Sequence, residues 1–154
     1  MARFTLKKRF TFEAAHYLPH HLGKCQRLHG HSWVGWVEVE GHELQATGPS
    51  AGMVIDFSDV ADAVKPLVDQ FLDHYLLNES LGMESPTSEA VAAWVFGRLA
   101  EQGLPVSAVT IVMDFNWSSL DVMLSLGCEG SRGKVRSKDR WPLASAGNIG
   151  FASR

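Results

Sequence analysis

Two stretches near the N-terminus alternate apolar and polar residues, and this pattern constrains the fold more than any other feature. Residues 3–16, RFTLKKRFTFEAAH, and residues 31–44, HSWVGWVEVEGHEL, place apolar side chains at most alternate positions. A period of two is typical of strands that bury one face. The segment between them, residues 17–28, YLPHHLGKCQRL, lacks this period and is rich in polar side chains. We therefore predict a β-hairpin whose long connection carries chemistry.

Two later segments have helical spacing instead. Residues 58–72, SDVADAVKPLVDQFL, and residues 86–103, PTSEAVAAWVFGRLAEQG, repeat apolar side chains every three or four positions. This period predicts two helices, with an expected kink at Pro66 in the first. The segment between them, residues 73–86, DHYLLNESLGMESP, is predicted to be a loop.

The last apolar runs complete a sheet. Residues 105–115, PVSAVTIVMDF, and residues 119–126, SLDVMLSL, predict a third and a fourth strand joined by a turn. The order strand, strand, helix, helix, strand, strand predicts an α+β domain. We expect a four-stranded antiparallel sheet with both helices on one face.

The chain changes character after this domain, which we place at residues 1–126. Residues 127–154 are rich in Gly, Ser and basic residues and show no periodicity. They are predicted to form an irregular or disordered tail. The alternative is a segment that folds against a neighbouring subunit through Trp141 and Phe151.

The composition narrows the classes of function. A net charge of −3 provides no overall basic surface for nucleic acid or an anionic membrane. No apolar run reaches the length of a membrane span, and the charged, alternating start differs from a signal peptide. With only two cysteines, Cys25 and Cys128, we expect reduced thiols and a cytoplasmic location.

A His-Gly-His sequence predicts half of a metal site. In an extended strand His29 and His31 point to the same side. A catalytic zinc site usually has three protein ligands and one open position. His16 is the preferred third ligand because hairpin pairing brings the end of the first strand to the start of the second. The other candidates are His20, His21, His42 and His74. Other divalent metals also suit three imidazoles.

Two further groups suggest acid–base chemistry. Cys25 lies between Lys24 and Arg27, and positive neighbours favour a thiolate. Asp73 followed by His74 can form a carboxylate–imidazole pair, which would fix the tautomer of the imidazole. The alternatives are an exposed loop with incidental histidines and an inert thiol, and a helix end with an ordinary histidine.

Four stretches of the chain resemble one known family. They are FTFEAAHYLPHHLGKCQRLHGHSW, GMVIDFSDV, LDHYLLN and PTSEAVAAWVF. Over about residues 3–112 the chain resembles the 6-pyruvoyl-tetrahydropterin synthase family. Within it the motifs are most similar to those of the bacterial 6-carboxy-5,6,7,8-tetrahydropterin synthases. The resemblance implies the tunnelling fold, in which ββααββ subunits surround a pore. It also implies hexamers of two trimers with active sites between subunits.

The resemblance implies a reaction as well. Family members act on 7,8-dihydroneopterin triphosphate, and the carboxy-forming enzymes release triphosphate and acetaldehyde in queuosine precursor synthesis. The catalytic cysteine matches Cys25, and its acid–base partners match Asp73 and His74. The family holds zinc through three histidines, which match His16, His29 and His31.

The pterin-binding residues match only in part. Thr87, Ser88 and Glu89 match a PT-x-E segment near the pterin pocket, although a helix cap explains them equally well. The family ends its third strand with a Glu-Thr pair whose Glu anchors the pterin, and this chain has Met113 and Asp114 there. Losing a bidentate charge-assisted pair costs about 3–5 kcal/mol of recognition. We predict that Asp114, swung over by a β-bulge, or backbone groups compensate.

The preferred function is therefore a zinc-dependent lyase that forms 6-carboxy-5,6,7,8-tetrahydropterin. One alternative is the sister activity that forms the 6-pyruvoyl product. Another is a non-catalytic or altered-substrate member of the family, which Met113 favours and the presence of Cys25, Asp73 and His74 disfavours. A third is a related enzyme, such as an aldolase that acts on unphosphorylated dihydroneopterin.

Overall fold

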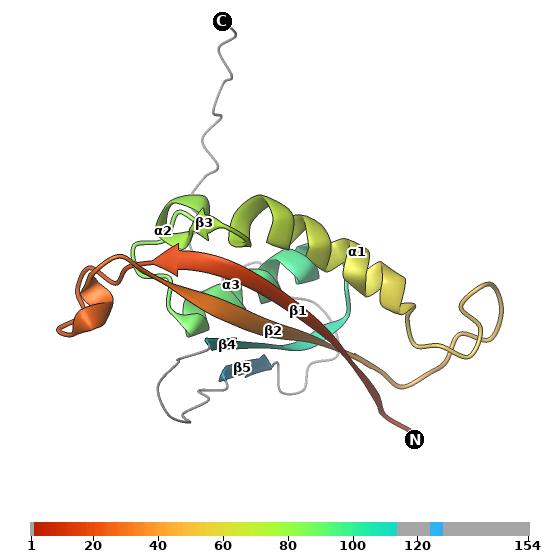
Figure 1. The fold of residues 1–154 in the computed structure, drawn as a ribbon. Helices are drawn as coiled ribbons and strands as arrows, with labels where there is room; N and C mark the ends of the chain where they lie inside the picture. Colours follow the sequence, from red (N-terminus) through yellow and green to blue (C-terminus); the bar gives the residue numbers. More distant parts are fainter. Residues whose placement is uncertain (1, 114–123, 128–154) are drawn as a thin grey trace, which may run out of the picture.

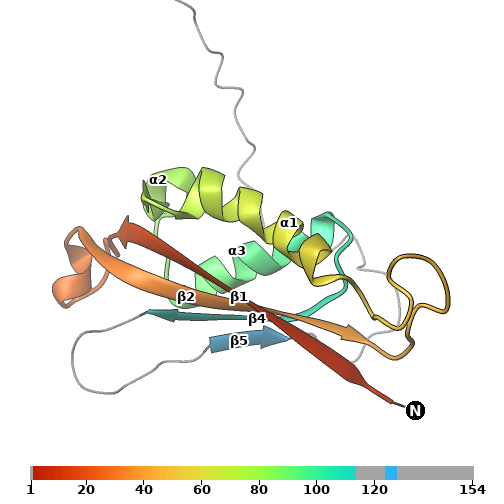
Figure 2. The same cartoon turned by 45° about the vertical axis from the view of Figure 1, so that its right-hand side comes forward.

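The computed structural model describes residues 2–113 and 124–127. Two helices, α1 (Phe57–Leu67) and α3 (Ser88–Glu101), cover one face of a twisted sheet (Figures 1 and 2). The sheet contains five strands among the described residues, in the order β3-β1-β2-β4-β5. The strands are β1 (Phe4–His16), β2 (His29–Gly41), β3 (Tyr75–Leu76), β4 (Val106–Met113) and β5 (Leu124–Gly127).

The predicted hairpin is confirmed as the centre of the sheet. Strands β1 and β2 pair antiparallel without a register shift, from Phe4 opposite Gly41 to His16 opposite His29. The side chains of β1 that face the helices become more buried toward its end, where Phe12 and His16 are each 2% exposed. Because side chains alternate between faces, this register places the histidines at the strand ends on the helix side.

Helix α1 changes form after its proline. Asp56 caps its start, since the Asp56 Oδ1 atom accepts a 2.8 Å hydrogen bond from the Ser58 amide. Pro66 has no N–H and therefore removes one helical hydrogen bond. The chain continues as a π-helix, η2 (Val68–Leu72), and ends where the Asp73 amide donates to the Val68 carbonyl at 2.8 Å. The expected disturbance at Pro66 thus takes the form of wider turns.

The loop prediction for residues 73–86 is wrong in part. This segment contains β3, which pairs in parallel with Ala14 and Ala15 of β1, and a short helix, α2 (Leu77–Ser80). A two-residue strand and a single helical turn are too short to produce a periodic pattern. Strand β3 is held by its pairing with β1, and the preceding His74 amide donates a 2.6 Å hydrogen bond to the Glu13 carbonyl.

The predicted α+β class is confirmed. The four strands β1, β2, β4 and β5 form the antiparallel ladder, and β3 adds a short parallel edge. The core lies between the sheet and helices α1 and α3, and it includes fully buried Val37, Ile111 and Leu99. The start of the predicted fourth strand, Asp114 and the predicted tail beyond residue 127 lie outside the described residues. Within the described ranges, no helix has both the length and the apolar character needed to cross a bilayer.

Candidate metal centre and active site

Three histidines converge where β1 ends and β2 begins. His16 lies directly opposite His29, and His31 lies opposite Ala14 on the same face. One ligand atom from each of the three imidazoles lies within 4.8 Å of the other two. The ring centroids are 4.6 Å apart for His16 and His29 and 4.8 Å apart for His29 and His31. The structure thus brings together the three residues that the sequence favoured as metal ligands.

The other candidate histidines have different partners. His20 contacts Glu84 at 2.7 Å, and His42 contacts Glu40 at 3.2 Å. The His21 imidazole accepts a 2.8 Å hydrogen bond from the Gly23 amide. All three of these histidines are exposed, and within the described residues none adds a ligand to the three-histidine cluster.

Backbone carbonyls set the tautomers of two members of the cluster. His16 Nδ1 donates to the Pro86 carbonyl at 2.8 Å, and His29 Nδ1 donates to the Arg27 carbonyl at 2.6 Å. A carbonyl only accepts, so each Nδ1 carries the proton and each Nε2 keeps its lone pair. The Nε2 atoms of all three imidazoles are covered from solvent. Within the described residues, those of His16 and His29 have no hydrogen-bond partner. This donor set fits a divalent metal.

The environment of the cluster favours the neutral form of His16 and His31, the form in which imidazole binds a metal. Burial, followed by the repulsion of His16 and His29, lowers the pKa of His31 from 6.5 to about 4. Burial also lowers the pKa of His16, against the opposing effect of its bond to the Pro86 carbonyl. The indole of Trp33 is fully buried beside the cluster, with its ring centroid 5.2 Å from that of His16.

The metal-free protein is expected to lose stability as pH falls from about 6.5 to about 4, the unfolded and folded pKa values of His31. In this window the unfolded chain binds a proton at His31 that the folded chain excludes, so acid favours unfolding. Urea midpoints measured across this range should fall, and His31→Gln should flatten the slope. An unchanged slope in His31→Gln would contradict this explanation.

The Asp73–His74 pair forms as predicted. Asp73 Oδ2 lies 2.8 Å from His74 Nδ1, and Asp73 Oδ1 accepts a 2.9 Å hydrogen bond from the Glu13 amide. The Glu13 amide, followed by His74, lowers the pKa of Asp73 below its usual value. An ionised Asp73 holds the proton of His74 on Nδ1 and leaves Nε2 able to accept another. His74 has a φ of +63°, a conformation uncommon for a residue with a side chain.

One groove is lined by both His74 of this pair and His31 of the histidine cluster. It has a volume of about 530 Å³ and runs beside the paired ends of β1, β2 and β3. His31 and His74 both line it, together with Glu13 and Ser32. The Ser32 hydroxyl donates to the Glu13 carboxylate at 2.8 Å. Sequence reasoning missed Glu13 and Ser32, which face outward at alternate positions and resemble ordinary surface residues.

Cys25 lies in the connection between β1 and β2, the strands that carry the three-histidine cluster. It belongs to a short 3₁₀ turn, η1 (Lys24–Gln26), and its side chain is half-buried. Its carbonyl accepts a 2.8 Å hydrogen bond from the Leu18 amide, which closes the connection into a compact loop. We name residues 17–28 the cysteine loop.

The residues proposed to bind pterin occupy structural positions. Thr87 caps α3, because its hydroxyl accepts a 3.3 Å hydrogen bond from the Ala90 amide. Ser88 is 3% exposed, whereas Glu89 is exposed. Met113 ends β4 opposite Trp33 and packs against the core. The register from Val109 to Met113 has no bulge, and Asp114 lies outside the described residues.

The sequence is similar to several curated proteins. The chain is 60% identical to a 6-carboxy-5,6,7,8-tetrahydropterin synthase of Synechocystis over 98 residues, which cover 64% of this chain and 76% of that protein. A synthase of the same name from Haemophilus influenzae is 33% identical over 129 residues, covering 70% of this chain and 91% of that protein. A putative synthase of the same name from Archaeoglobus fulgidus is 42% identical over 101 residues, covering 66% of this chain and 80% of that protein.

Solved structures show the same fold. The 6-pyruvoyl tetrahydropterin synthase of Caenorhabditis elegans superposes with a TM-score of 0.66 at 23% identity, covering 84% of this chain and 98% of that one. An uncharacterized protein from Wolinella succinogenes superposes with a TM-score of 0.61 at 21% identity, covering 84% and 100%. At these identities the likeness concerns the fold, and the predicted tunnelling fold is confirmed.

The match to a family model covers most of the chain. Residues 5–116 match the model of 6-pyruvoyl tetrahydropterin synthase, which is most of the predicted domain. With the curated relatives, this match confirms the predicted family and the prediction that the chain is an enzyme. The chain belongs to the 6-pyruvoyl tetrahydropterin synthase family.

Proposed function

We propose that the chain is a zinc-dependent lyase that converts 7,8-dihydroneopterin triphosphate to 6-carboxy-5,6,7,8-tetrahydropterin. The observation that supports the proposal is the shared groove, whose lining residues include both His74 of the proposed acid–base pair and His31 of the three-histidine cluster. The names of the relatives from Synechocystis and Haemophilus influenzae supply the product, 6-carboxy-5,6,7,8-tetrahydropterin. Binding a metal alone requires neither Asp73 nor Cys25.

The metal would be held by the three imidazoles through their Nε2 atoms. Those of His16 and His29 are oriented for this by the carbonyls of Pro86 and Arg27. A bound zinc ion supplies Lewis-acid chemistry, which acidifies a substrate hydroxyl and polarises a carbonyl. Neutral ligands leave its full charge available for this purpose.

The acid–base pair accepts the proton that a substrate hydroxyl or C–H group must lose. Asp73 keeps the Nδ1 proton of His74 in place, so Nε2 is the atom that accepts. Two hydrogen bonds to the Glu13 backbone, one from the His74 amide and one to the Asp73 carboxylate, anchor the backbone that carries His74 beside the groove. Cys25 provides a second group for proton transfer on the cysteine loop.

The stoichiometry of the reaction explains why two proton-transfer groups, His74 and Cys25, are needed. Substrate and one water give the 6-carboxy product, acetaldehyde and triphosphate. The bond between the first and second side-chain carbons breaks, and so does the C–O bond to triphosphate. The carbon next to the ring is oxidised to a carboxylate, the ring gains two hydrogens, and the terminal carbon is reduced to the methyl group of acetaldehyde. The electron balance therefore closes inside the substrate, and the protein moves protons between side chain and ring. Lys24 and Arg27, which flank Cys25, supply positive charge for the triphosphate.

Turnover of the zinc-loaded protein tests the proposal. The protein is incubated with 7,8-dihydroneopterin triphosphate and the products are identified by mass spectrometry. We expect the 6-carboxy product and acetaldehyde, lost in Cys25→Ala and retained in the matched control Cys128→Ser. A 6-pyruvoyl product would assign the sister activity, and no turnover by zinc-loaded protein would refute the proposal for this substrate.

Met113 favours a second candidate, a family member with an altered substrate. Its thioether packs against the core and cannot accept the hydrogen bonds of a pterin ring. We infer instead that Asp114 takes over this recognition. Asp114→Ala should then raise KM for the pterin about 10- to 100-fold, from the 1.5–3 kcal/mol of a charge-assisted bond, with a smaller change in kcat. An unchanged KM would favour the altered substrate.

We further infer a hexamer with active sites between subunits and a cytoplasmic location. The described part of the sheet supports assembly through β1, whose outer edge is paired with β3 only at Ala14 and Ala15. An open strand edge invites pairing with another chain. Light scattering coupled to size exclusion measures the assembly, and a monomer would contradict this inference.

A further inference from the structure

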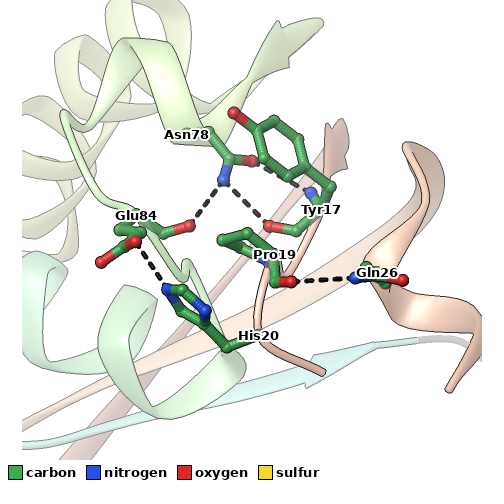
Figure 3. Close-up of polar contacts among 6 residues, drawn as sticks. All are labelled: Tyr17, Pro19, His20, Gln26, Asn78 and Glu84. Carbon is green, nitrogen blue, oxygen red and sulfur yellow. Dashed lines mark hydrogen bonds and ion pairs between the residues drawn. The ribbon is translucent and has the colours of Figure 1, made fainter. Parts of the chain in front are cut away.

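Asn78 is a buried polar residue in α2 whose amide contacts three backbone groups. Its Oδ1 atom accepts a 3.0 Å hydrogen bond from the Tyr17 amide. Its Nδ2 atom donates at 2.9 Å to the carbonyl of Tyr17 and at 2.9 Å to the carbonyl of Glu84 (Figure 3). Each partner can act in only one direction, so the orientation of the amide is fixed. Asn78 is 9% exposed.

These contacts join the segments that build the candidate site. Tyr17 directly follows His16 and begins the cysteine loop, in which the Leu18 amide bonds to the Cys25 carbonyl. Glu84 leads into Pro86, whose carbonyl accepts the hydrogen bond from His16 Nδ1. A single side chain therefore connects α2, the cysteine loop and the segment that orients a metal ligand.

At the end of the loop, the Arg27 carbonyl accepts a 2.6 Å hydrogen bond from His29 Nδ1. Two side-chain contacts nearer its start are weaker attachments. The bond between His20 and Glu84 joins two side chains that are 76% and 72% exposed (Figure 3). The bond from Gln26 to the Pro19 carbonyl lies within the loop itself. Water competes with exposed contacts. If a buried amide is removed, in contrast, its partners lose their hydrogen bonds and no water replaces them.

We propose that Asn78 is a positioning residue: it fixes the cysteine loop, and with it Cys25, relative to the three-histidine cluster. Only an amide of this length offers one acceptor and two donors in this arrangement. Aspartate lacks the donors, and alanine lacks all three bonds. The catalytic consequence rests on the proposed function, while the placement of Cys25 and the metal site does not.

Asn78→Ala and Asn78→Asp test the proposal in a Cys128→Ser background, where Cys25 is the one thiol of the chain. The matched control is Ser80→Ala in the same helix, which removes a 2.7 Å bond to the Phe71 carbonyl and leaves the loop contacts intact. The measurements are alkylation of Cys25 by iodoacetamide, the visible spectrum of bound Co²⁺, kcat, KM and the melting temperature.

Release of the loop should expose the half-buried thiol and misplace it. We expect at least fivefold faster alkylation, a changed Co²⁺ spectrum, and kcat lowered by about 10- to 100-fold, as for outer-shell residues of metal sites, with a smaller change in KM. Ser80→Ala should lower the melting temperature and leave the other values within twofold of the parent.

Unchanged alkylation and an unchanged Co²⁺ spectrum in folded Asn78→Asp or Asn78→Ala would overturn the proposal. If both variants fail to fold, hydrogen exchange at the Tyr17 and Leu18 amides of the parent chain decides. If these amides exchange as fast as those of an exposed loop, the proposal that Asn78 fixes the cysteine loop is refuted. Alkylation and Co²⁺ spectra need no substrate, so they remain decisive even if the parent does not turn over the pterin.

Discussion

Replacing His29 with alanine is expected to abolish turnover and to lower zinc affinity by more than the roughly 100-fold that outer-shell substitutions cause. The cluster has three imidazoles, and the loss of one leaves two protein ligands, fewer than a catalytic zinc site normally has. Competition against a chelating dye measures the affinity. The matched control is His42→Ala. His42 directly follows β2, at the opposite end of the strand from His29, and contacts Glu40.

A stability measurement checks the same prediction without substrate. A metal that binds only the folded state stabilises it by about 2.7 kcal/mol when present at 100 times its dissociation constant. Zinc should therefore raise the melting temperature of the parent and of His42→Ala, and should not raise that of His29→Ala. An equal shift in all three proteins would show that zinc binds elsewhere.

The second large effect is expected for Asp73→Asn, which should lower kcat by about 10³–10⁴-fold, by analogy with the loss of tautomer control in a serine protease triad. Asparagine can still accept from the Glu13 amide through Oδ1, but its NH₂ group then faces His74 Nδ1. Nδ1 must become the acceptor, so the proton moves to Nε2 and the ring can no longer accept one from the substrate.

The control for this substitution is Asp69→Asn, four residues earlier on η2, where the carboxylate pairs with exposed Lys65. It removes the same charge from the same segment and should leave kcat unchanged. Zinc affinity should stay at the parent value in both variants, since neither residue belongs to the cluster. Full activity in Asp73→Asn would remove the acid–base role from the pair.

The sequence was sufficient to favour the three-histidine cluster over the other candidates because simple geometry governs it. A period of two assigns His29 and His31 to one face, and antiparallel pairing brings the end of β1 to the start of β2. His16 then follows as the third member. The Asp73–His74 contact needed even less, since the two residues are neighbours in the chain.

The supporting groups could not be predicted from residue types. The Pro86 carbonyl that orients His16 is a backbone atom, and every residue has one. Asn78 lies 61 residues from Tyr17 in the chain, in a segment without periodicity. The positive φ of His74 has no sequence signal, because the residue is not glycine. In each case tertiary packing supplies the information.

The three imidazoles project from paired strands, whereas Cys25 projects from the loop that joins those strands. The two parts of the site therefore tolerate different kinds of change. Strand register fixes the backbone of the three histidines, so residues inserted between Leu22 and Gly23, away from the Arg27 carbonyl that contacts His29, should change zinc titrations far less than they displace the thiol. Such length changes allow metal affinity and catalytic chemistry to diverge separately during evolution, and they give protein engineers a place to exchange the reactive group while the metal stays in position.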